Sequence, residues 1–172
     1  MLDHLKREAE ARPIKRKKVL GYLKFHDTGV AFIQETHFGN DKETLKMRRD
    51  WVGKVFHNSV SSKSRGVMTL LNKKRNFVFL KQLQDDDGRL LCIQALINEI
   101  KVVLVNVYAP NGDEPDFIYK SIKMLSNLKG QILIGQNRFH VNRWPKPSTD
   151  ICAHQRKKRK KDPLNYVYIT KD

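Results

Sequence analysis

Two polar side chains stand where apolar segments of the chain come to an end. Glu35 closes the run that begins at Val30, and Tyr108 closes the run that begins at Val102. Such short apolar runs predict buried strands that deliver the groups at their ends to one rim of a sheet. A carboxylate there is a suitable ligand for Mg²⁺, which binds hard oxygen atoms and keeps most of its waters. The plainer alternative for Glu35 is a solvated acid, and that for Tyr108 is an aromatic ring that caps the core.

The elements that must position these groups follow from apolar periodicity and from turn signals. Asn40 and Glu43 form a capping pair at the start of a helix, and Asp85-Asp-Asp-Gly88 is a turn between two strands. The predicted helices run from Pro13 to Lys24, from Asp41 to Arg49, and onward from Asp113 with an apolar stripe of Ile118, Ile122 and Leu125. The predicted strands are Val30 to Glu35, Trp51 to Phe56, Val67 to Leu71, Phe77 to Leu83, Arg89 to Ile97, Ile100 to Tyr108, Gln131 to Ile134, and a late run from Tyr166 to Thr170.

This order predicts an α+β protein in which strands pack sheet to sheet and helices lie outside. A chain of 172 residues is long enough for one domain with a core and too short for two comfortable ones. We expect a solvated segment at residues 1–12, a domain at residues 13–135, and a divergent, largely disordered basic tail at residues 136–172.

A series of short motifs lies along these elements: Pro13 to Leu20, Gln34-Glu-Thr-His37, Arg49-Asp-Trp-Val-Gly53, Ser62 to Val67, and Asn106 to Gly112. In their order and spacing the chain resembles the endonuclease/exonuclease/phosphatase superfamily, and most closely the apurinic-like endonuclease domain of LINE-type retrotransposons. The resemblance covers residues from Pro13 to Ile134. It implies a four-layer α/β sandwich of two facing, mostly antiparallel sheets, of which this chain holds a truncated version with an incomplete second sheet.

The resemblance also implies a reaction, the Mg²⁺-dependent nicking of DNA, and roles for particular residues. Glu35 would bind the metal and Tyr108 would donate a hydrogen bond to the phosphate. Arg65 and Asn111 would lie near the DNA backbone, with Asn111 also shaping its turn, and Asn106 would be a buried structural amide. The basic helix would add phosphate contacts from Lys15, Arg16, Lys17 and Lys18.

Three departures from the family pattern concern catalysis. The strand that carries a metal-site Asn before the basic helix is missing from Met1 to Arg12. The family's Gly-Gly-Asp-Phe-Asn motif, whose Asp activates water, reads Gly135-Gln-Asn-Arg-Phe139 here, so Asn137 stands at the position of the acid. A shift of one residue puts Arg138 there and restores no carboxylate. The closing Ser-Asp-His motif is absent.

The loss of one transition-state donor costs roughly 10²- to 10³-fold in rate, and groups that act as a unit fail together. We therefore expect no significant nuclease activity and a weak or vestigial Mg²⁺ site.

The composition favours a polyanionic partner. Lys and Arg outnumber Asp and Glu by 34 to 18, for a formal charge of +16, which predicts binding to DNA, and to RNA as well, without sequence preference. A basic surface without function is the alternative. The block Arg156, Lys157, Lys158, Arg159, Lys160 and Lys161 fits a nuclear localisation signal, a phosphate-binding arm, or a solvated tail.

The remaining composition points to an intracellular protein. No apolar stretch approaches the roughly 20 residues of a membrane span. Cys92 and Cys152 are 60 positions apart, which supports neither a disulfide framework nor a zinc site, and Cys92 fits a small core residue.

The sequence thus predicts a truncated, degenerate LINE-type endonuclease domain. The alternatives are a non-catalytic nucleic-acid-binding module and a poorly folded fragment without function. The oligomeric state stays open.

Overall fold

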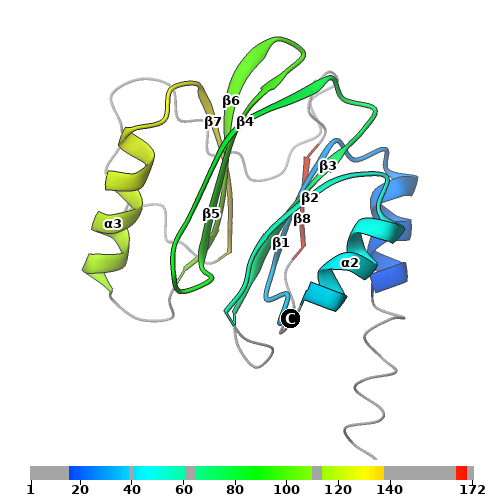
Figure 1. Ribbon diagram of the computed structural model, residues 1–172, viewed down its shortest axis with the longest axis horizontal. Helices are drawn as coiled ribbons and strands as arrows, with labels where there is room; N and C mark the ends of the chain where they lie inside the picture. Colours follow the sequence, from blue (N-terminus) through cyan, green and yellow to red (C-terminus); the bar gives the residue numbers. More distant parts are fainter. Residues whose placement is uncertain (1–15, 39–40, 61–64, 110–113, 138–165, 170–172) are drawn as a thin grey trace, which may run out of the picture.

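The protein is described by a computed structural model that covers residues 16–38, 41–60, 65–109, 114–137 and 166–169. Two sheets face each other, and helices lie on their outer faces (Figure 1). The predicted α+β sandwich is confirmed. Among the described helices, none is both long and apolar enough to span a membrane.

The first sheet has the strand order β2-β3-β1-β8. Its strands are β1 (Val30–Gln34), β2 (Gly53–Asn58), β3 (Val67–Asn72) and β8 (Tyr166–Ile169). β3 pairs antiparallel with both β1 and β2, and β8 lies parallel to β1 on the other side. A helix at residues 16–25 and helix α2 (Asp41–Asp50) cover the outer face of this sheet (Figure 1).

The second sheet has the order β4-β5-β6-β7. The strands β4 (Phe77–Gln84), β5 (Leu90–Ile97) and β6 (Ile100–Tyr108) form an antiparallel meander. Helix α3 (Pro115–Ser126) then crosses the outer face, so that β7 (Gln131–Asn137) returns parallel to β6 (Figure 1). A two-residue turn at Asn98-Glu99, with positive φ at both residues, joins β5 to β6.

Several predicted boundaries are wrong, and β7 runs on to Asn137 where the prediction ended it at Ile134. Two of the errors have identifiable reasons. β2 runs from Gly53 to Asn58, not from Trp51 to Phe56. The Trp51 amide still bonds to the Met47 carbonyl at the end of α2, and the buried Trp51 indole donates to the Leu71 carbonyl. β1 ends at Gln34, one residue early, because Glu35 has a φ of 53° and cannot continue an extended strand.

The predicted stripe on α3 is only partly correct. Phe117 and Ser121 are its buried residues, whereas Ile118 and Leu125 are half-buried at the edge of the contact with the second sheet. The late β-like run is confirmed as β8, which adds a strand from the predicted tail to the first sheet. Asn40 lies outside the described residues, so its capping role stays a prediction.

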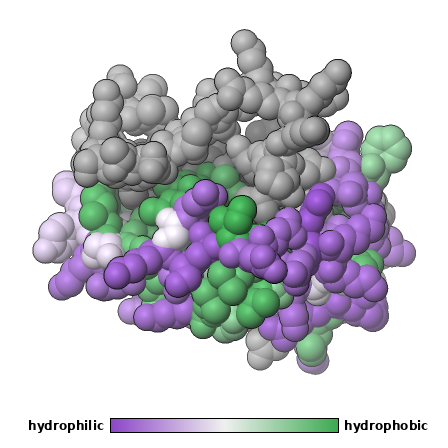
Figure 2. All heavy atoms as spheres, turned by 90° about the horizontal axis from the view of Figure 1, so that it is seen from above, coloured by the Kyte–Doolittle hydropathy of each residue, from purple (hydrophilic) through white to green (hydrophobic). Residues whose placement is uncertain are grey.

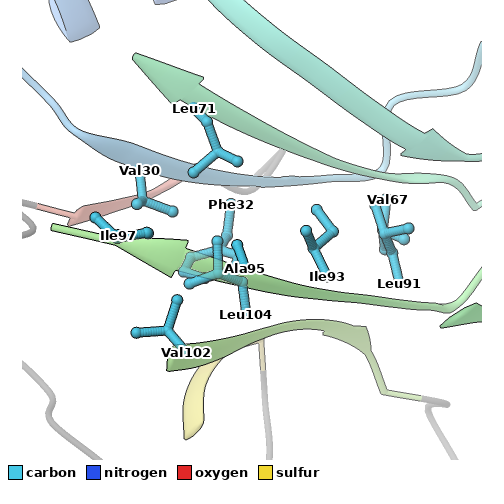
Figure 3. Close-up of a cluster of buried hydrophobic side chains, with 10 residues drawn as sticks. All are labelled: Val30, Phe32, Val67, Leu71, Leu91, Ile93, Ala95, Ile97, Val102 and Leu104. Atoms are coloured by element: carbon cyan, nitrogen blue, oxygen red, sulfur yellow. The ribbon is translucent and has the colours of Figure 1, made fainter. Parts of the chain in front are cut away.

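The main core lies between the sheets. Alternate residues of each strand point inward, as the two-residue period of strands requires, and side chains from β1 and β3 meet those from β5 and β6 (Figure 3). The intervening residues, such as Ala31 and Ile33, pack under the helices instead. Cys92 is a core residue as predicted, on the face toward α3, and burial raises its pKa to about 12.

Some apolar side chains remain at the surface. In the view from above, they gather in the middle of the molecule with polar side chains on both flanks (Figure 2). Val78, Phe79 and Leu80 of β4 are among the exposed residues, which leaves this edge strand partly uncovered. A large exposed apolar patch often marks a binding surface.

A glycine on β7 allows the two sheets to approach. A Cβ atom on Gly135 would lie 2.3 Å from Cγ of the buried Phe32. We predict that Gly135→Ala lowers the free energy of unfolding by about 1–3 kcal/mol, as overpacked cores do. Gly21 is the matched control, because it lies in the helix at residues 16–25 with no atom within 4 Å of the added Cβ. Gly21→Ala should stabilise the protein by up to about 1 kcal/mol.

Urea unfolding followed by circular dichroism measures both changes. A Gly135→Ala variant as stable as the natural chain would contradict the close packing of Phe32 against β7.

Candidate functional site

A buried pair of amides joins the two sheets just below one rim. Gln34 is the last residue of β1, is only 3% exposed, and faces the second sheet. Its Nε2 donates to the Val107 carbonyl at 2.7 Å, to Asn106 Oδ1 at 3.2 Å and to the Gly135 carbonyl at 3.3 Å. Asn106 Nδ2 in turn donates to the Met68 carbonyl at 2.8 Å. These bonds connect β1 and β3 to β6 and β7, and Asn106 is the buried amide that the sequence predicted.

This pair fixes where Glu35 and Tyr108 lie. Glu35 follows Gln34 directly, and Tyr108 follows Val107, whose carbonyl accepts the 2.7 Å bond from Gln34. The ends of β1 and β6 therefore meet at the same rim, as expected from the sequence. Both side chains are half-buried, and Tyr108 packs against the core between the sheets. In the β6–β7 pairing Tyr108 lies beside Asn137, so the position where the resemblance implies an acid is at this rim too.

The loops at the rim carry strained backbone. Glu35, His37 and Arg65 have positive φ values of 53°, 51° and 63°. The amides of Thr36 and His37 bond to the carbonyls of Gly66 and Arg65, which ties the loop after β1 to the entry of β3. Gly66 has a φ of 101°, and a Cβ there would lie 2.4 Å from Thr36 Oγ1. Strained residues of this kind cost about 1–3 kcal/mol each and concentrate at functional sites.

An acidic turn between β4 and β5 borders the same rim. Asp85 Oδ1 accepts hydrogen bonds from the Leu90 amide at 2.8 Å, the Arg89 amide at 2.9 Å and Asn58 Nδ2 at 2.7 Å. Burial nevertheless raises the pKa of Asp85, and the nearby charge of Asp87 adds to that effect, while the backbone donors oppose it. The sequence identified this segment only as a turn.

The other predicted site residues are dispersed. Arg65 lies at the rim, where its guanidinium is 3.7 Å from the Asp87 carboxylate. Lys17 and Lys18 are exposed on the helix at residues 16–25. Arg16 is mostly buried and pairs with Asp50 at 2.9 Å, which gives it a structural contact that the prediction of phosphate binding did not include. The predicted residues Lys15, Asn111 and Arg156 to Lys161 lie outside the described residues.

The described residues do not assemble a strong metal site. Among them, no group of three His, Cys, Asp or Glu residues is placed to hold an ion. Mg²⁺ can bind through one or two carboxylates and several waters, and Glu35 offers one carboxylate at the rim. This donor set fits the metal poorly, so we derive no catalytic step through it.

Comparison with solved structures identifies the class of fold. The chain matches truncated TDP2 from Caenorhabditis elegans with a TM-score of 0.52 and 16% identity, over 72% of this chain and 54% of that one. It matches a humanized TDP2 of D. rerio with a TM-score of 0.50 and 15% identity, over 74% and 55%. The chain therefore has the endonuclease/exonuclease/phosphatase fold in partial form.

Comparison of sequences adds a relative of a particular kind. The chain is 32% identical over 111 residues to a 149 kDa protein of transposon TX1 from Xenopus laevis. The match covers 64% of this chain but only 8% of that protein. No family model matches the chain. The sequence is thus similar to that of a transposon protein, and the fold is that of the solved TDP2 structures, as the resemblance implied.

The raised pKa of Asp85 predicts how stability depends on pH. Because the pKa of Asp85 in the folded protein lies above its ordinary value of 3.8, the unfolded chain loses this proton first as pH rises. The free energy of unfolding therefore falls as pH rises from the ordinary pKa through the raised one. Asp85→Asn keeps an oxygen for the three donors and removes the charge. We expect the variant to gain stability over the natural chain at pH 7 and to gain less at pH 3.5.

Asp86→Asn is the control for net charge, because it removes one negative charge at an exposed residue of the same turn. Its gain in the free energy of unfolding should differ less between the two pH values. Urea unfolding at both pH values measures the effect. An equal or larger gain at pH 3.5 would show that the buried carboxylate is well stabilised.

Proposed function

We propose that this chain is the endonuclease-like domain of a LINE-type retrotransposon, that it binds nucleic acid through phosphate contacts, and that it has lost efficient hydrolysis of phosphodiesters. The domain comprises residues 13–135 together with β8. The fold and the transposon relative support the class. The runner-up is a binding module whose nucleic-acid partner is unrelated to nicking.

One observation carries the proposal. The 2.7 Å bond from Gln34 to the Val107 carbonyl joins the ends of β1 and β6, so a carboxylate and a phenol lie at one rim. A phenol can donate a hydrogen bond to a phosphoryl oxygen, and a carboxylate can hold a cation next to it. The strained loops around Glu35 and Arg65 support a functional role for the same rim.

The amide side chain at position 137 argues against hydrolysis of phosphodiesters. Asn137 lies beside Tyr108 in the sheet, at the end of β7. An amide cannot accept a proton from the attacking water as a carboxylate does. The first acid after Ile134 is Asp150, so no carboxylate is available near this strand end in the sequence.

Charge supports binding without sequence preference. The formal charge of +16 attracts the phosphate backbone, and backbone contacts position a protein without reading bases. The block Arg156 to Lys161 would serve as a phosphate-binding arm or a nuclear localisation signal. Both DNA and RNA should bind, since both present the same phosphates.

Nicking of supercoiled plasmid in Mg²⁺ tests the proposal. We expect the natural chain and Glu35→Ala to give the same background, and Asn137→Asp to recover nothing, because the His and its Asp partner are still missing. The same preparations should bind duplex DNA, with log affinity falling linearly against log salt at a slope near −0.9 per phosphate neutralised.

Robust nicking that depends on Glu35 would overturn the loss of hydrolysis. Deletion of residues 156–161 should make the salt slope shallower by several units if the block contacts phosphates. A chain that neither binds DNA nor unfolds cooperatively would be the poorly folded fragment.

A further inference from the structure

A groove runs along one side of the sandwich. β2 and β4 are edge strands of their sheets, and they lie on the same side because Phe56 of β2 contacts Phe77 and Phe79 of β4. A cavity of about 550 Å³ opens along β2, lined by Arg48, Lys54, Phe56, His57 and Gln82 among others. β2 ends at Asn58, which pairs with Val67 at the entry of β3, so the groove leads toward the rim.

The charge of this groove selects for an anion. Its lining includes the basic residues Arg48, Lys54 and His57, and none of its lining residues is acidic. A second cavity, of about 340 Å³ between the β4–β5 turn and α3, has the opposite character: its lining includes Asp85, Asp87, Glu114 and Asp116, with one basic residue, Lys120. The two cavities differ in sign, so net charge alone does not account for the basic groove.

Next to the cavity, the exposed aromatic ring of Phe79 packs on Phe56, one of the residues that line it. Phe79 stacks on Phe56 with ring centroids 5.6 Å apart and an interplanar angle of 18°. Phe77 supports Phe56 edge-on at 6.1 Å. Phe79 remains 47% exposed although its ring is held by these neighbours. Proteins that bind single-stranded nucleic acids stack the bases on exposed aromatic rings that lie beside basic side chains. Phe79, which is held by Phe56, is a ring of this kind.

A second protein strand is a poorer occupant of these edges. Exposed edge strands can pair with other chains, but lysines and bulges on the edge oppose such pairing. β4 carries a register shift between Phe79 and Lys81, and both Lys81 and Lys54 are exposed on the edges. Duplex DNA is also a poorer fit for the ring, because the faces of its bases are already stacked on one another.

We propose that the groove between the edges of β2 and β4 binds single-stranded nucleic acid, with a base stacked on Phe79 and the backbone phosphates near Lys54 and Arg48. Binding in this groove does not require Glu35 or the rim. A single strand bound at the rim could extend along the side of the domain into this groove.

Fluorescence anisotropy with a labelled dT12 strand and with a hairpin duplex tests the groove in the full chain. Phe79→Ala should weaken binding of dT12 about 5- to 100-fold, as the loss of one stacked base does, and should change duplex affinity less than twofold. Phe79→Leu should lose nearly as much, and Phe79→Trp should restore binding because it returns a stacking face. Thermal melts show that each variant is folded.

A charge reversal separates the groove from net charge. Lys54→Glu should weaken dT12 binding and make its salt dependence shallower, whereas Lys120→Glu makes the same change of charge in the acidic cavity and should have a smaller effect. The nicking assay and the duplex salt titration report on the rim, whereas dT12 binding by the Phe79 variants reports on the groove, so failure of the rim proposal is distinguishable from failure of the groove proposal.

Three results would overturn the groove proposal: Phe79→Ala and Phe79→Leu binding dT12 like the natural chain, equal losses for dT12 and duplex, or a dimer of the natural chain that Phe79→Ala dissociates.

Discussion

The structure depends on one buried polar contact, the amide pair of Gln34 and Asn106 between two mostly apolar sheet faces. A buried amide without partners costs about 1–3 kcal/mol, so the sheets are most stable where each amide meets its acceptors on the facing sheet. Apolar contacts tolerate sliding of one sheet over the other, but these directional bonds do not. The pair therefore sets how β1 and β3 lie over β6 and β7, and with that it sets the position of both strand ends. Gln34 Oε1 is buried and accepts no hydrogen bond from the described residues, which lowers the stability of this arrangement.

The features of the rim follow from that constraint. The carbonyl of Gly135 accepts a hydrogen bond from Gln34, and the missing side chain of Gly135 lets Phe32 pack against β7. The amide pair and this close contact therefore lie side by side on β1 and β7. Beyond Gln34 the backbone turns at Glu35, and the loops from β1, β3 and the β4–β5 turn are joined by backbone hydrogen bonds. The ends of β1, β6 and β7, with positions 35, 108 and 137, are thus brought to one end of the sandwich. Our proposal of retained binding and lost hydrolysis concerns this end of the sandwich.

Much of the fold could be predicted from the sequence, because strand and turn signals are local. The break after each apolar run indicated correctly that Glu35 and Tyr108 stand at strand ends. The inward position of Gln34 was also available, since it is two residues after Phe32 and four after Val30. The role of Asp85 could not be predicted, because its burial depends on Asn58 and Leu90 from other strands. The groove between β2 and β4 likewise depends on which strands become edges, and the partner of β8 is 136 positions away at Val30.

A double-mutant cycle on the amide pair tests the central claim most directly. The free energy of unfolding is measured by urea titration for the natural chain, Gln34→Leu, Asn106→Leu and the double variant. Each single change removes the 3.2 Å bond between the amides and leaves the remaining amide with its backbone acceptors alone, which should cost about 1–3 kcal/mol. The double change removes both polar side chains and should cost clearly less than the sum of the two single changes. A coupling energy of about 0.5–3 kcal/mol is the result that this structure predicts. Strictly additive losses would mean that the two amides do not interact, and that the sheets are held in register by something else.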